Sequence, residues 1–282
     1  MTSHPQNDTL REWRETAKYW TRHSDTIQKM FAPVTEAIIE RAGIMEGHAV
    51  LDVAGGAGEP SLTIAEHVGP TGSVTCTDGV AEMVEAARAE ATSRGITNVQ
   101  FRQCTADSLP FADESFDVVV CRLGAMFFPD PLAACKEMLR VMKPGGAIAF
   151  VVWHKNELNP FCYLITDVVS RHVPAPPMDP DAPGAFRFAE PGKLASILTQ
   201  AGATDVNDEV LHFHIAAPIT AQQFWNMRSE TSDTLRAKLA TLSEAQRLQV
   251  AEEVQNSVRP FFPNDEMNFP AQMIIVTARK QA

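Results

Sequence analysis

The chain has 282 residues, of which 45% are hydrophobic and 21% charged, a balance that excludes disorder as the dominant state. The formal net charge of −11 argues against general nucleic-acid binding, since an acidic surface repels phosphate backbones. No run of about 18 apolar residues is present, and the polar N-terminus lacks the core of a signal peptide. We therefore expect a cytoplasmic protein without a membrane span. The five cysteines form no C-x-x-C pair, which favours free thiols over a metal site.

The predicted elements change character along the chain. Residues 9–30 are amphipathic and predict one or two helices, and Pro33 predicts the start of another, which Gly43 ends. Apolar runs of strand length then alternate with helical segments. Strands are predicted at 48–53, 73–77, 99–104, 116–121 and 147–153, and helices at 60–67, 80–94 and 131–142.

The pattern changes again after residue 153. A proline-rich stretch covers 155–190 and cannot be a central strand. A helix at 190–202, a strand at 206–215, helices within 220–258 and a last strand at 272–277 complete the chain. We therefore predict an α/β fold: a seven-stranded, mostly parallel sheet with helices on both faces, N-terminal helices and helical cap insertions.

The first strand runs into a glycine turn. The sequence Asp52-Val53-Ala54-Gly55-Gly56-Ala57-Gly58 is typical of a nucleotide-binding turn that opens a helix. A dinucleotide site needs a third glycine where Ser61 stands. The Asp52 carboxylate also suits a ligand with a cationic end better than a pyrophosphate. A nicotinamide-dependent oxidoreductase is therefore disfavoured, although it stays open.

Carboxylates follow three successive predicted strands. Asp52 ends the first strand, Asp78 the second and Asp107 the third. All three fall on the carboxyl edge of the sheet, where open α/β sheets bind ligands. Asp78 lies where a carboxylate accepts hydrogen bonds from ribose hydroxyls. Each aspartate taken singly could instead be a helix cap or turn residue.

These motifs together resemble the class I S-adenosylmethionine (SAM)-dependent methyltransferases, in the small-molecule group similar to the ubiquinone/menaquinone enzymes. The resemblance is dense over residues 45–153 and implies a Rossmann-like fold. The matching segments are Leu51–Gly58, Thr77-Asp78 with Glu82-Met83, Ala106–Phe111, Ser115-Phe116-Asp117 and Arg140–Gly146. It implies a helical segment 1–44 covering the cofactor site, a SAM-binding core 45–154, and remaining strands 155–282. Two cap insertions are expected at about 155–189 and 219–265.

The resemblance also implies the residues that contact SAM. Gly56 and Gly58 would pass under its methionine part, Asp78 would hold the ribose and Asp107 the adenine amino group. The full implied set is Asp52, Ala54, Gly56, Gly58, Asp78, Gly79, Met83, Ala106, Asp107, Ser108, Arg122, Tyr19 and Trp20.

Two of these residues carry an open question. Ala54 stands where the family usually has glycine, which is tolerable if its φ is negative. Arg122 would line the pocket near the methionine part, but it could instead be a structural ion-pair partner.

The expected reaction is an in-line displacement at the SAM methyl group, for which the protein aligns the acceptor and excludes water. A general base is optional. His154, after the fifth strand, is the best-placed candidate, and His23 in the N-terminal segment is another. Either histidine could be purely structural.

The insertions carry candidates for an acceptor pocket. Pockets for small molecules are mostly apolar with a few polar groups, although core packing also explains such residues. The candidates are Phe161, Phe186, Phe188, Trp225 and Arg228. We therefore expect a small, largely apolar acceptor, no nucleic-acid partner and no metal, and leave a homodimer open. A SAM-binding protein without catalysis and a methyltransferase acting on macromolecules remain as alternatives.

Overall fold

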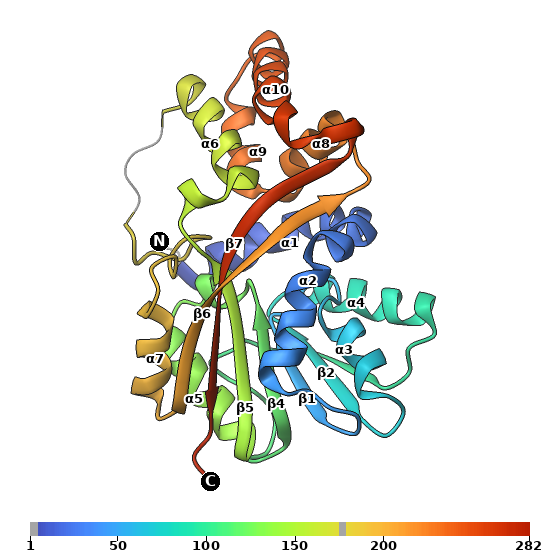
Figure 1. The fold of residues 1–282 in the computed structure, drawn as a ribbon, viewed down its shortest axis with the longest axis vertical. Helices are drawn as coiled ribbons and strands as arrows, with labels where there is room; N and C mark the ends of the chain where they lie inside the picture. The colour runs from blue at the N-terminus through green and yellow to red at the C-terminus, as the bar shows by residue number, and fades with distance from the viewer. Residues whose placement is uncertain (1–4, 175–178) are drawn as a thin grey trace.

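The computed structural model describes residues 5–174 and 179–282 (Figure 1). One seven-stranded sheet has the order β3-β2-β1-β4-β5-β7-β6. The first five strands pair in parallel, and β7 is antiparallel to both neighbours. The predicted α/β fold with seven mostly parallel strands is confirmed. The strands are β1 (Ala49–Val53), β2 (Ser73–Asp78), β3 (Val99–Gln103), β4 (Phe116–Arg122), β5 (Met142–Trp153), β6 (Thr204–Ala217) and β7 (Met267–Arg279).

Helices cover the sheet and cap one end of it. Helix α2 packs on β5 and β6, α3 on β2, α4 on β2 and β3, and α5 on β5. Central strands are buried on both faces, which is why they read as continuous apolar runs. The helices are α1 (Pro5–Arg22), α2 (Ser24–Ala42), α3 (Ser61–Val68), α4 (Ala81–Arg94), α5 (Pro131–Val141), α6 (Pro160–His172), α7 (Lys193–Ala201), α8 (Ala221–Thr231), α9 (Asp233–Ala240) and α10 (Glu244–Val258).

Pro33 does not start a helix, contrary to the sequence prediction. It lies inside α2, which begins at Ser24. An internal proline costs a helix about 3 kcal/mol, because it removes a hydrogen bond and crowds the preceding turn. The apolar face of α2, with Met30, Phe31 and Val34 all buried, packs into the core and holds the helix together across this position.

Helices α6, α8, α9 and α10 form a cap at the extended ends of β6 and β7. Both strands run past the sheet core and pair as far as Ala217 with Met267, and α8, α9 and α10 lie in the connection between them (Figure 1). Helix α6 packs against α10. An aromatic cluster of Phe161, Phe224, Phe262 and Phe269 fills the space between these elements. Within the described ranges, no helix is long and apolar enough to cross a membrane.

Candidate active site

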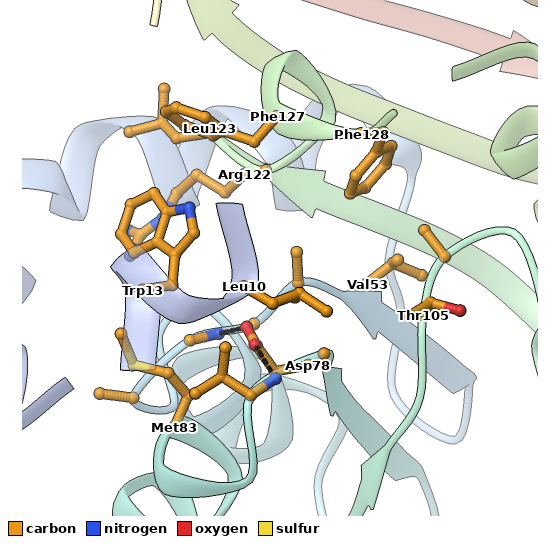
Figure 2. A pocket seen from close by; sticks show the side chains of 18 of the residues that line it. Leu10, Trp13, Val53, Asp78, Met83, Thr105, Arg122, Leu123, Phe127 and Phe128 are labelled. Atoms are coloured by element: carbon orange, nitrogen blue, oxygen red, sulfur yellow. Dashed lines mark hydrogen bonds between the residues drawn. The ribbon is translucent and has the colours of Figure 1, made fainter. Parts of the chain in front are cut away.

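A cavity lies at the carboxyl edge of the sheet, where β1, β2 and β4 end, and α1 covers it (Figure 2). Its wall is mostly apolar. Polar groups enter it from the strand ends, among them Asp78 after β2 and Arg122 at the end of β4. This is the edge at which open α/β sheets bind ligands.

Asp78 is fixed by two backbone amides. Its Oδ2 accepts a hydrogen bond from Gly56 at 3.0 Å, and its Oδ1 accepts one from Val80 at 2.9 Å (Figure 2). Burial raises the pKa of Asp78 to about 6, although the amides oppose that shift. Each carboxylate oxygen keeps a lone pair for a ligand hydroxyl.

The glycine turn has the left-handed backbone at three positions. The φ values are +60° at Ala54, +55° at Gly56 and +116° at Gly58. The φ at Ala54 is therefore positive, so the condition under which its methyl group would be tolerated is not met. A Cβ added to Gly124 would lie only 2.6 Å from the Cβ of Ala54, so the chain accommodates the alanine methyl group by having no side chain at 124.

Gly56 and Gly58 differ in what surrounds them. Gly56 lines the cavity, and a Cβ there would meet no atom within 4 Å. Gly58 does not line it. A Cβ at Gly58 would lie 3.0 Å from Leu62 Cδ1, which indicates that Gly58 allows α3 to pack close to the turn.

Asp52 lies behind the turn and not in the cavity wall, contrary to its expected place beside the cofactor. It is fully buried, and Ser61 Oγ donates a 2.6 Å hydrogen bond to its Oδ2. No described group bonds to its Oδ1. Burial raises the pKa of Asp52 to about 6, while the Ser61 bond and the Arg122 charge lower it.

Arg122 lines the cavity and is held by neutral groups. Its Nη1 donates to Thr35 Oγ1 at 3.0 Å, and its Nη2 donates to the Glu59 carbonyl at 2.9 Å. Its guanidinium lies 5.6 Å from the centre of the Phe31 ring. In the described part of the chain no carboxylate forms an ion pair with Arg122, so the ion-pair alternative does not hold. Burial lowers the pKa of this arginine.

The structure separates the other expected cofactor residues into two groups. Gly79, Met83, Ala106 and Asp107 line the cavity together with Ala54. Ser108, the next residue after Asp107, is exposed and does not line the cavity.

Only one of the two predicted α1 aromatics reaches the cavity. Trp20 lines it, whereas Tyr19 lies on another side of α1, with Arg22 and Arg236 over its ring. Trp13, and not Tyr19, lines the cavity together with Trp20. Its ring lies 5.7 Å from Trp20 and 5.1 Å from Phe127.

Neither candidate histidine lies in the cavity wall. His154 is buried, and its Nδ1 lies 2.7 Å from the Ala189 carbonyl oxygen. His23 Nε2 lies 2.7 Å from Glu230 Oε2, which ties the α1–α2 corner to α8. Both rings serve contacts between elements, so the structure does not support either as the base of this site.

The predicted acceptor residues also lie outside the cavity wall. Phe161 and Phe188 are buried, and Phe186 packs partly buried against the same core. Trp225 borders a separate shallow hollow between α8 and α10. Arg228 lies over the Phe161 ring, 4.6 Å from its centre.

Sequence reasoning missed several residues that do form the wall. They come from one face of α1, from α2, from the turn between β1 and α3, and from the loop after β4. The missed residues include Leu10, Trp13, Ser24, Ile27, Phe31, Glu59, Leu123, Phe127 and Phe128. The spacing of Leu10 and Trp13, three residues apart on a helix, was the available signal.

The sequence model of the ubiE/COQ5 methyltransferase family matches residues 27–167, half of the chain. The chain belongs to this family. This family falls among the class I SAM-dependent methyltransferases, which use SAM as their cofactor. One relative is the ubiquinone/menaquinone biosynthesis C-methyltransferase UbiE of Cellvibrio japonicus, 41% identical over 123 residues, 43% of this chain and 49% of that protein.

Another relative is the uncharacterized methyltransferase YcgJ of Bacillus subtilis, 39% identical over 126 residues, 44% of this chain and 49% of that protein. The crystal structure of YcgJ shares the fold, with a TM-score of 0.56 at 22% identity over 88% of this chain and 98% of that one. The structure of Haemonchus contortus phosphoethanolamine N-methyltransferase 2 in complex with SAM has a TM-score of 0.59 at 16% identity. That match covers 97% of this chain and 60% of the other. The chain spans about half the length of these curated relatives.

The residues of the cavity fit SAM. Asp78 offers a carboxylate for ribose hydroxyls, and Met83 and Val80 offer apolar surface for the adenine. The open space at Gly56 leaves room for a ligand to lie against the backbone.

Proposed function

We propose that this protein transfers the methyl group of SAM to a small, largely apolar acceptor. The observation that carries the proposal is that one cavity combines polar groups from the strand ends with a wall of aromatic side chains. Asp78 and the glycine turn line the same cavity as the aromatic side chains Trp13, Trp20 and Phe31. A covered apolar cavity suits a small molecule better than a protein or nucleic-acid chain.

Three groups of residues are proposed to hold the cofactor. Asp78 accepts hydrogen bonds from the ribose hydroxyls, and Met83 packs against the adenine. Asp107 contacts the adenine amino group from the loop after β3. Arg122 lies near the methionine carboxylate, where a buried cation would find its counter-charge.

When bound, SAM supplies an electrophilic methyl group on its sulfonium. The task of this chain is then to orient the acceptor and exclude water. Helix α1 excludes water by covering the cavity with Leu10 and Trp13. No histidine of the described residues lines the wall, so we propose an acceptor atom that needs no histidine to remove its proton.

Methyl-labelled SAM incubated with the protein and a cell extract tests this proposal. We expect the label in the organic phase, and mass spectrometry would then identify the product. The name of the Cellvibrio relative makes a quinol ring one acceptor to assay directly. Label confined to precipitated protein or nucleic acid would contradict the small-molecule proposal. Tight binding of S-adenosylhomocysteine (SAH) without transfer to any acceptor would favour a SAM-binding protein without catalysis.

A further inference from the structure

Helix α1 and the α1–α2 corner, residues 20–24, form the cover of the cavity. Trp20 and Ser24 of the corner belong to the cavity wall. Arg22 and His23 lie between them in the sequence but do not line the cavity, and their side chains contact α8 of the cap instead. The corner therefore faces the cavity with some of its residues and the cap with others.

One carboxylate, that of Glu230 near the end of α8, binds both cap-facing residues. Arg22 Nη1 donates a 2.7 Å hydrogen bond to Glu230 Oε1, and His23 Nε2 lies 2.7 Å from Glu230 Oε2. Each carboxylate oxygen thus contacts one residue of the corner. The side chains of His23 and Glu230 are 20% and 30% exposed, so this contact is better shielded from solvent than a pair on the open surface.

The corner has few other contacts that would fix it. His23 is the N-cap of α2, yet its side chain makes no capping hydrogen bond, because the ring is directed at Glu230. Within residues 10–22 of α1, only Thr16 and Ala17 are buried. Burial of such small side chains contributes little hydrophobic stabilisation. The position of the corner therefore depends strongly on its contact with Glu230.

The ion pair on the other half of α1 is weaker. Arg14 Nε lies 3.5 Å from Glu82 Oε1 of α4, and both side chains are about half exposed. Ion pairs with that exposure contribute little to stability. The contact at Glu230 is shorter and better shielded, and Arg236 of α9 supports it by approaching the Glu230 carbonyl oxygen at 3.5 Å.

We propose that Glu230 is a positioning residue that holds the α1–α2 corner over the cavity, and that release of this contact limits the exchange of SAM and SAH. This inference rests on the proposed function, because it takes SAM to bind beneath α1. Leu10, Trp13 and Trp20 of α1 all line the cavity, so the cover moves when a ligand of this size passes. Opening of such covers is a common limit on turnover.

A contact that holds the cover closed acts on entry and exit alike. The bond to Glu230 forms in the closed arrangement with or without a ligand, so it lowers the open population by the same factor in both cases. Its loss should raise the association and dissociation rates together and leave Kd nearly unchanged. Loss of a residue that contacts the ligand would change mainly the dissociation rate, and loss of a purely structural residue would change neither.

Stopped-flow measurement of SAH binding by tryptophan fluorescence tests the proposal. Trp13 and Trp20 line the cavity, whereas Trp153 and Trp225 are buried outside its wall. Glu230→Gln should raise both rate constants about fivefold to tenfold and leave Kd within about twofold. Raising the KCl concentration from about 0.05 M to about 0.5 M should accelerate exchange in the wild type more than in Glu230→Gln.

Further variants test whether the effect belongs to this contact. Arg22→Gln should reproduce part of it, since His23 keeps the other carboxylate oxygen. The double variant of Arg22→Gln and Glu230→Gln should exchange SAH no faster than Glu230→Gln alone, because both changes remove one contact. Glu230→Asp keeps the charge and should exchange SAH more slowly than Glu230→Gln. Arg14→Gln and Glu252→Gln, the latter at an exposed position on α10, are controls and should stay within about twofold of the wild type.

Unchanged association and dissociation rates in Glu230→Gln, whatever its Tm, would overturn the proposal and leave Glu230 as a structural contact. A rise confined to the dissociation rate would overturn it as well. If Glu230→Gln does not fold, Arg22→Gln decides, because that side chain is 59% exposed and its loss leaves the core intact. Failure of the wild type to bind SAH would instead contradict the proposed function.

Discussion

Asp78 and Gly56 are joined by a hydrogen bond of 3.0 Å from the glycine amide to the carboxylate. This bond connects the end of β2 with the turn after β1, so the carboxylate that faces the cavity is oriented by the turn that shapes it. A second bond from the Val80 amide fixes the other carboxylate oxygen at the start of α4. The site is therefore largely preformed.

Asp78→Asn should weaken SAH binding about tenfold to a hundredfold. The amide replaces a charged acceptor, and hydrogen bonds to charged groups are worth about 1.5–3 kcal/mol. Calorimetric titration measures the change. Asp205→Asn, at an exposed position on β6, is the matched control and should bind SAH as the wild type does. Equal affinity of Asp78→Asn and the control would remove Asp78 from the cofactor site.

Trp13→Ala and Tyr19→Ala should differ although both lie on α1. Trp13 lines the cavity, and Tyr19 does not. Loss of the Trp13 ring should weaken SAH binding by about 1–2 kcal/mol, roughly tenfold. Tyr19→Ala should leave the affinity unchanged. If fluorescence titration ranks the two variants in the opposite order, α1 does not cover the cofactor as described.

Ala54→Gly should stabilise the protein slightly. A left-handed backbone costs a residue with a Cβ about 1–2 kcal/mol, and the added chain entropy of glycine offsets roughly half of that. We expect a rise in Tm of about 1–3 °C. Gly56→Ala, at φ +55° with no atom near its Cβ, should lower Tm by a similar amount. A fall in Tm for Ala54→Gly would show that the alanine methyl packing against Gly124 outweighs the strain.

Asp52 should make stability fall as the pH rises through its transition. The folded-state pKa is raised from 3.8 to about 6, so the folded state binds more protons than the unfolded state between these values. The wild type should therefore lose about 3 kcal/mol relative to Asp52→Asn between pH 4 and pH 8. Urea unfolding of both proteins across this range measures the difference.

Asp117→Asn is the control, because the Asp117 pKa is shifted in the opposite direction and the pH dependence of stability should be reversed. Burial alone would raise the Asp117 pKa, but the Lys143 ammonium at 2.7 Å and the Ala49 amide at 2.8 Å outweigh it and lower the pKa. This carboxylate stabilises the fold above its ordinary pKa, and the contribution disappears as the pH falls through the folded value. Asp117→Asn should be less stable than the wild type at pH 7 and approach it in acid. Parallel pH profiles for the two variants would contradict the assigned environments.

His154→Gln and His23→Gln should retain methyl transfer to an acceptor found in the extract assay. Both rings lie outside the cavity wall and contact the Ala189 carbonyl and Glu230 respectively. We expect kcat within about threefold of the wild type, together with a lower Tm for His154→Gln because that ring is buried. A loss of kcat beyond about a hundredfold with SAH affinity intact would make the histidine a base after all.

The sheet could be predicted because its signals are local. Buried parallel strands such as β4 read as apolar runs, and β1 ends in a glycine turn. Asp78 and Arg122 both line the cavity, because the ends of parallel strands share one edge of the sheet. Pro33 departs from the prediction because the buried face of α2 sustains the helix across a proline that would end an isolated helix.

The remaining parts of the site depend on packing between distant elements. His154 follows β5 at the correct edge, but its ring bonds to Ala189, a contact 35 residues away in sequence that no local pattern contains. The choice between Trp13 and Tyr19 depends on the rotation of α1 over the sheet. Asp52 belongs to the glycine motif, yet the turn itself covers it.

The structure of the protein with SAH bound tests the central claim most directly. The account predicts the ribose hydroxyls within hydrogen-bond distance of the Asp78 carboxylate, the adenine beside Met83, and the Trp13 ring over the ligand. SAH bound elsewhere on the chain, or a ribose that does not contact Asp78, would contradict it.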